Sequence, residues 1–137
     1  MSQPFTKTPI EPLPPETNAT AHKIVDAAFA VHKNLGPGLL ESVYEVCLVH
    51  ELIKRGLAVK QQLAVPILYD NIRLDGGLRL DLLVEDRVIV ELKTVDLVLP
   101  VHKAQVLTYL KLTGHRLALL INFNAHLIKN GIFRIIL

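Results

Sequence analysis

The spacing of hydrophobic residues changes from helical to strand-like near residue 57. Within residues 20–35, apolar side chains recur every three or four positions, which predicts an amphipathic helix. Gly36-Pro37-Gly38 ends this helix, and residues 39–55 repeat the helical spacing before Gly56. The first part of the chain therefore predicts two consecutive helices.

Short apolar runs rich in Val, Leu and Ile follow at residues 57–69, 78–84 and 88–93, and they predict strands. Asp70-Asn71 is a turn signal, and residues 85–87 predict a hairpin loop. Pro100 opens a predicted helix that Gly114 ends, and strands are expected at 117–123 and 132–137. The order α-α-β-β-β-α-β-β predicts an α/β (α+β) sheet with helices packed on it.

The N-terminal segment differs in composition from the rest of the chain. Residues 1–17 contain five prolines, which predicts an extended or flexible tail, or an arm that packs on a neighbouring subunit. Residues 18–137 have the length of one domain. The apolar content and this arm suggest a homo-oligomer.

Composition excludes several classes of protein. The chain has 137 residues, half of them apolar, and a net charge of +2, which does not by itself indicate nucleic acid. One cysteine allows neither a disulfide nor an iron–sulfur cluster within a chain. No apolar run reaches the length of a membrane span and no signal peptide is evident, so we expect a cytoplasmic protein with no membrane partner. No glycine-rich loop for a nucleotide cofactor is present.

Three charged residues interrupt the most apolar strands. Glu91 and Lys93 alternate with Val90 and Leu92, so they share one face of their strand. If residues 85–87 form a three-residue loop, Val84 pairs with Val88 and Asp81 lies opposite Glu91. Carboxylates on facing residues repel each other unless a cation lies between them.

Such a pair suits a hard divalent ion, Mg²⁺ or Mn²⁺, with the backbone carbonyl of Leu92 as a further ligand. Lys93 would then orient or deprotonate a bound water, or neutralise charge on a phosphate. The alternative is that Glu91 and Lys93 form a solvated ion pair at the end of a strand.

Asp81 together with Glu91-Leu92-Lys93 resembles the motif of the PD-(D/E)XK nuclease superfamily. Gly38-Leu39-Leu40-Glu41-Ser42-Val43-Tyr44 fits G-x-x-E-x-x-Y and, with residues 32–38 and 119–124, is similar to the GxxExxY protein family. The resemblance implies a nuclease-like core with a central mixed sheet between helices. It also implies a metal-dependent nuclease, acting on DNA rather than RNA.

Gln105 and Tyr109 resemble the Q-x-x-x-Y motif of RecB-type nuclease domains, where the pair lies near the active site and contacts nucleic acid or orients catalytic residues. These two residues share a helix face. Relatives also place an acid and a histidine from early helices at the metal, which makes Glu41 and His32 candidate ligands. The alternative for both is a favourable position in the dipole of a helix.

Two further residues are candidates for substrate binding. Tyr44 lies one turn after Glu41, where it either hydrogen-bonds Glu41, touches phosphate, or packs as a half-buried side chain. Lys103 belongs to a cluster of cations around residues 102–116 that is either a phosphate track or an ordinary solvated face. Asn122 and Asn124 flank Phe123, and they either cap the sheet edge or contact another subunit.

The sequence thus predicts a Mg²⁺- or Mn²⁺-dependent nuclease. Asp81, Glu91, Lys93 and Glu41 are its catalytic candidates. Two rivals remain: a nuclease-fold binding or assembly protein without catalytic activity, and a hydrolase of another phosphate ester.

Overall fold

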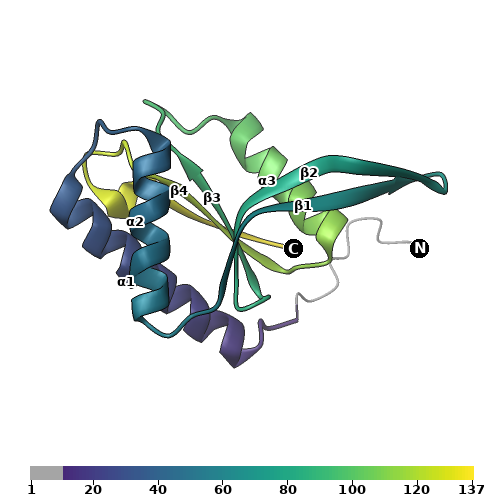
Figure 1. Ribbon diagram of the computed structural model, residues 1–137, viewed down its shortest axis with the longest axis horizontal. Helices are drawn as coiled ribbons and strands as arrows, with labels where there is room; N and C mark the ends of the chain where they lie inside the picture. Colours follow the sequence, from purple (N-terminus) through teal and green to yellow (C-terminus); the bar gives the residue numbers. More distant parts are fainter. Residues whose placement is uncertain (1–10) are drawn as a thin grey trace, which may run out of the picture.

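A five-stranded mixed sheet with helices on both faces forms the protein (Figure 1). The computed structural model describes residues 11–137. In chain order the elements are α1 (Pro15–Leu35), α2 (Glu41–Lys54), β1 (Val59–Tyr69), β2 (Ile72–Val84), β3 (Val88–Lys93), α3 (Pro100–Thr113), β4 (Leu117–Asn122), η1 (Ile128–Gly131) and β5 (Ile132–Ile136). The predicted α+β class is confirmed, although the short 3₁₀ helix η1 was not foreseen.

The strands lie in the order β1-β2-β3-β4-β5. Neighbouring strands are antiparallel except for β3 and β4, which are parallel. A parallel pair needs a crossover connection, and the segment containing α3 supplies it. The ends of β3 and β4 therefore meet at one edge of the sheet.

Two hydrophobic clusters lie on opposite faces of this sheet. Val88, Val90 and Leu92 of β3 pack with α1 and α2, whereas Ile89 packs with α3. Because side chains alternate along a strand, Glu91 and Lys93 take the face of Ile89. This places Glu91 and Lys93 on the α3 side of the sheet.

Helix α1 begins earlier than the sequence predicted. Pro15 stands in its first turn, where the missing N–H has no partner to lose and the fixed φ suits a helix. The expectation of a nonhelical tail up to residue 17 is therefore wrong for residues 15–17. The tail predicted for residues 1–10 lies outside the described residues.

The hairpin between β2 and β3 has the predicted register. Val84 pairs with Val88, and Glu85 and Asp86 both have φ of 54° in the loop. The ladder continues only through Leu82 and Val90. The register needed to place Asp81 opposite Glu91 is therefore present.

Strand β2 begins at Ile72 rather than at residue 78, the start predicted from the sequence. Gly76 and Gly77 lie inside the strand instead of before it. Between Val65 and Ile67 the register with β2 shifts, so that residues 75–77 oppose Pro66 in a bulge. A Cβ on Gly77 would stand 2.8 Å from Cδ1 of Ile67, so a larger residue there would make the Ile67 side chain shift. The chain reverses at Asp70 and Asn71, with φ of 49° and 65°, as a two-residue type I′ turn requires.

Candidate functional site

The candidate site lies where β2 and β3 separate. Beyond the Leu82–Val90 pair, side chains replace the backbone ladder. The N–H of Asp81 donates to Oε1 of Glu91 over 3.0 Å, and the N–H of Leu92 donates to Oδ2 of Asp81 over 2.9 Å. These reciprocal bonds fix both carboxyl groups in the gap between the strands.

A change in the alternation of β2 explains how Asp81 reaches this gap. Leu78, Leu80 and Leu83 all pack on the α3 side, although strict alternation would put Leu80 and Leu83 on opposite faces. Opposite Asp81, Gln62 of β1 adopts φ of 48°. The Nε2 of Gln62 donates to Oε1 of Glu45 on α2 over 2.9 Å, which ties the distorted strand to that helix.

Burial makes Glu91 a weaker acid than an exposed glutamate. Its side chain is only 5% exposed. Desolvation, followed by the charge of Asp81, raises the pKa of Glu91 to about 8, and a hydrogen bond between the two carboxyl groups acts in the same direction. The hydrogen bond from the Asp81 N–H opposes the rise, and the charge of Lys93 opposes it to a smaller extent. The carboxyl groups are therefore close enough to share a proton, and a cation between them would relieve their repulsion.

Glu41 belongs to the same electrostatic group. It is the first residue of α2, and partial burial followed by the charge of Asp81 raises its pKa. The ammonium of Lys93 partly offsets this effect. The N-terminus of α2 thus brings a third carboxylate towards Asp81 and Lys93.

Helix α3 contributes Tyr109 and Gln105 from its side of the sheet. Tyr109 is half-buried, and desolvation followed by the charges of Glu91 and Asp81 raises the pKa of its hydroxyl. A hydrogen bond with Gln105, which is exposed, opposes this rise. Tyr109 therefore lies near the carboxylates, and Gln105 contacts Tyr109 from an exposed position.

The carbonyl of Leu92 faces the same gap. In a strand the N–H and C=O of one residue point to the same edge. The Leu92 N–H is directed at Asp81, whereas the carbonyl of Lys93 accepts from Phe123 N on the opposite side over 2.9 Å. The Leu92 carbonyl is thus directed towards the carboxylates.

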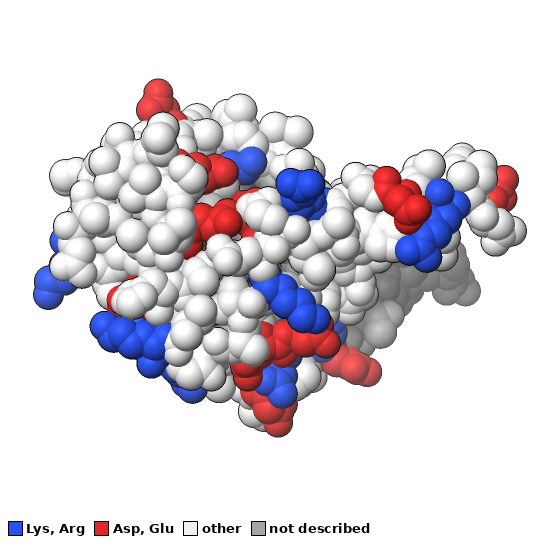
Figure 2. Space-filling model, viewed as in Figure 1, with Lys and Arg blue, Asp and Glu red and all other residues white. Residues whose placement is uncertain are grey.

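Figure 2 shows this arrangement on the surface, with acidic atoms recessed in a hollow beside α2 and basic atoms at its margin. Within residues 11–137, no group of three or more His, Cys, Asp or Glu side chains is arranged to hold a metal ion. The donor set nevertheless has the chemistry that Mg²⁺ prefers, because this ion is usually held by one or two carboxylates and keeps several waters.

Tyr44 does not fit the predicted contact with substrate. It is fully buried and stacks on Phe123, with ring centroids 4.8 Å apart. Its hydroxyl donates to the carbonyl of Gly36 over 2.6 Å and accepts from the N–H of Leu39 over 3.1 Å. Tyr44 therefore stabilises the turn between α1 and α2, which precedes Glu41. Its effect on the site is the positioning of Glu41.

His32 and Lys103 also have other contacts. The Nε2 of the buried His32 lies 2.8 Å from the carbonyl of Ala125, so this nitrogen carries the proton and does not suit a metal ligand. The ammonium of Lys103 lies 4.2 Å from the centre of the Phe133 ring, a cation–π contact on β5. Neither contact points towards the carboxylate pair.

Of the two roles that the sequence left open for Asn122, its hydrogen bonds show the cap of the sheet edge. It is buried at the end of β4, where Nδ2 donates to the carbonyl of Val95 over 2.8 Å and Oδ1 accepts from Val95 N over 3.1 Å. The N–H of Asn124 donates to the same oxygen over 3.2 Å. Asn122 thus caps the sheet edge and fixes the chain just after Lys93. An Asn directly after a buried apolar run was its only sequence signal.

A mixed sheet that splits at an Asp and an E-x-K motif, with helices on both faces, defines a nuclease-like class of protein. The family described as the PD-(D/E)XK nuclease superfamily matches residues 18–135. The chain therefore belongs to the PD-(D/E)XK nuclease superfamily, whose members act on nucleic acids and generally use divalent metals. No curated protein and no solved structure matches the chain. None of the described helices is long and apolar enough to cross a membrane.

Proposed function

We propose that the protein is a divalent-metal-dependent nuclease that hydrolyses phosphodiester bonds, with DNA favoured over RNA. The observation that carries this proposal is the reciprocal bonding of Asp81 and Glu91, which holds two carboxyl groups in a gap beside Lys93. The preference for DNA depends on the resemblance alone. The G-x-x-E-x-x-Y and Q-x-x-x-Y spacings support a place in the GxxExxY branch with RecB-like features.

In the proposed reaction the chain supplies ligands and charges. A bound Mg²⁺ or Mn²⁺ ion would polarise the phosphate and lower the pKa of a water. Asp81, Glu91 and the Leu92 carbonyl would hold this ion, and Glu41 would accept a hydrogen bond from a water beside it. Lys93 would orient the attacking water and neutralise the charge that develops on the phosphate.

Hydrolysis needs no further co-reactant. The water oxygen bonds to phosphorus while the bond from phosphorus to one sugar oxygen breaks. The leaving oxygen takes up a proton, so that the products are a phosphate monoester and a free hydroxyl. Tyr109 and Gln105, which border the gap on the α3 side, would position the nucleic-acid strand. Lys103 is a weaker candidate for strand contact, because its ammonium lies over Phe133.

The test is cleavage of duplex DNA, single-stranded DNA and RNA with Mg²⁺ or Mn²⁺, and with a chelator. We expect Asp81→Asn and Lys93→Ala to lose at least about 100-fold in rate, as the removal of a key electrostatic group does. Asp86→Asn, in the exposed β2–β3 loop, and Lys23→Ala, on the exposed side of α1, are the matched controls.

Unchanged cleavage in both site variants would overturn the proposed site. If the wild type binds metal but cleaves only small phosphate esters, the alternative hydrolase is correct. If it neither binds metal nor cleaves any of these substrates, it is a nuclease-fold binding or assembly protein.

A further inference from the structure

The β1–β2 hairpin projects from the body of the protein as an arm, with its tip at the far right of Figure 1. Its root is held in the α3-side cluster through Leu63, Val65, Leu78 and Leu80. Among the described residues, the side chains at the tip are not part of this cluster. Tyr69 is 70% exposed, Ile72 57% and Leu74 47%.

These three apolar side chains form one continuous face. Tyr69 pairs directly with Ile72, and Leu74 lies two residues further along β2 on the same side. The bulge opposite Pro66 sets the twist of the arm, and Ile67 packs over Gly77. An exposed apolar face on a projecting β-hairpin is typical of a surface that binds a partner.

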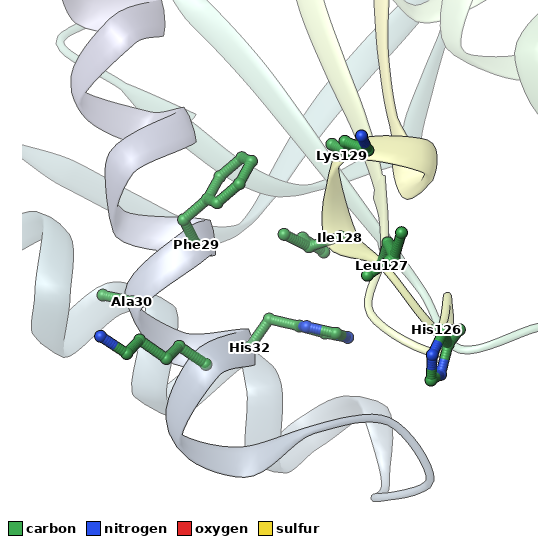
Figure 3. Close-up of a pocket in the computed structure, with 8 residues that line it drawn as sticks. Phe29, Ala30, His32, His126, Leu127, Ile128 and Lys129 are labelled. Carbon is green, nitrogen blue, oxygen red and sulfur yellow. The ribbon is translucent and has the colours of Figure 1, made fainter.

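An apolar pocket of about 390 Å³ lies between α1 and the segment that includes η1. Figure 3 shows Phe29 and His32 reaching from α1 towards Leu127 and Ile128 on the other wall. Phe29 is 44% exposed and Leu127 50%. The pocket therefore offers apolar walls that are open to solvent, with room for large side chains.

Charge distinguishes the two surfaces. Lys33, Lys129 and His126 line the pocket, and no Asp or Glu of residues 11–137 does. The arm tip carries Asp70 in its turn, while Arg73 is already paired with Asp75 over 2.7 Å. The tip thus has an excess of negative charge, which is complementary to the cations of the pocket.

The arm and the pocket lie at opposite ends of the protein, because α1 and the yellow η1 turn are at the left of Figure 1. A copy cannot insert its arm into its own pocket. Two copies side by side in opposite directions would each receive the arm of the other. A twofold arrangement of this kind doubles the buried area and closes the assembly.

We propose that the protein forms a dimer by reciprocal arm exchange, in which Tyr69 and its apolar neighbours fill the α1–η1 pocket of a second copy. The test is analytical ultracentrifugation of the metal-free full chain over a range of concentrations. Tyr69→Asp on the arm and Leu127→Asp in the pocket should each raise the dissociation constant at least about tenfold. An equimolar mixture of the two variants should partly restore dimers, because one intact arm and one intact pocket remain.

Charge variants provide a second, independent test of the dimer. Lys129→Glu should weaken the dimer, and adding Asp70→Asn should recover part of the loss, since Asn tolerates the turn conformation while removing the new repulsion. Val46→Asp is the matched control, because Val46 is an equally exposed apolar residue, at 66%, on α2. Circular dichroism of each variant confirms that it is folded.

The proposal is overturned by a monomeric wild type, or by a dimer that survives Tyr69→Asp. Survival of the dimer in Leu127→Asp would show that arms contact arms rather than pockets. Dissociation caused by Val46→Asp alone would move the interface to α2. If Tyr69→Asp reduces the binding of nucleic acid but leaves the mass unchanged, the arm is a nucleic-acid contact instead.

Discussion

Replacing Glu91 with Gln should make the protein more stable at neutral pH while abolishing its activity. The amide keeps an oxygen that accepts from the N–H of Asp81, a bond of 3.0 Å in the native chain, and gains an N–H that can donate to the Asp81 carboxylate. It removes the group whose pKa burial and Asp81 raise from 4.5 to about 8. The variant thus replaces a buried carboxyl group, whose ionisation is unfavourable in the folded protein, with a neutral amide.

The sign of the pH effect follows from the two pKa values of Glu91. Between about 4.5 and 8 the unfolded chain has released the Glu91 proton, whereas the folded chain still holds it. Rising pH in this window therefore favours the unfolded state, by about 1.4 kcal/mol per pH unit. From pH 5 to pH 7 the wild type should lose about 2–3 kcal/mol relative to Glu91→Gln.

Urea unfolding of both proteins in a chelating buffer, at several values between pH 5 and pH 8, measures this difference. Glu16→Gln, at an exposed position in the first turn of α1, is the control for the loss of a carboxyl group outside the site. A constant difference between wild type and Glu91→Gln over this range would refute the reasoning, because the carboxyl would then ionise as in water.

Three further predictions follow from the contacts of the site. Tyr44→Phe should lower the free energy of unfolding by about 1–3 kcal/mol in urea, since Gly36 O loses a buried partner while the stacking on Phe123 remains. Asn122→Leu should cost about 2–4 kcal/mol in the same measurement, because both backbone groups of Val95 lose their partner; an effect below about 1 kcal/mol would contradict the capping role. Mg²⁺ should raise the melting temperature of the wild type but not of Asp81→Asn, and an equal rise in both would place the metal elsewhere.

Much of the fold was accessible from periodicity and turn chemistry. The apolar spacing predicted α1 and α2, and Pro100 and Gly114 predicted the ends of α3. The three-residue loop predicted the pairing of Val84 with Val88 that the structure has. The errors occurred where one residue type serves two purposes. Pro15 starts a helix instead of preventing one, and β2 begins at Ile72 rather than at residue 78, with Gly76-Gly77 in a bulge inside it.

The site was accessible only in part, because strand spacing reports which residues share a face and not how a strand distorts. Asp81, Glu91 and Lys93 could be placed together from the register alone. The positive φ of Gln62 and the change in alternation at Asp81 leave no pattern in the sequence. The role of Tyr44 was ambiguous for a different reason, because a tyrosine on a helix can direct its hydroxyl inward to a turn or outward to solvent. In the structure the hydroxyl points inward and donates to the carbonyl of Gly36.

The two carboxylates at the strand split accept hydrogen bonds that a regular ladder would give to backbone carbonyls. The sheet therefore continues through its own acidic side chains at this point. Alanine at Asp81 would leave the Leu92 amide without its acceptor. An activity assay of this variant could not separate the loss of a metal ligand from the loss of a hydrogen bond that holds the sheet. Amide replacements separate chemistry from architecture here, because they retain an acceptor oxygen and remove the ability to ionise.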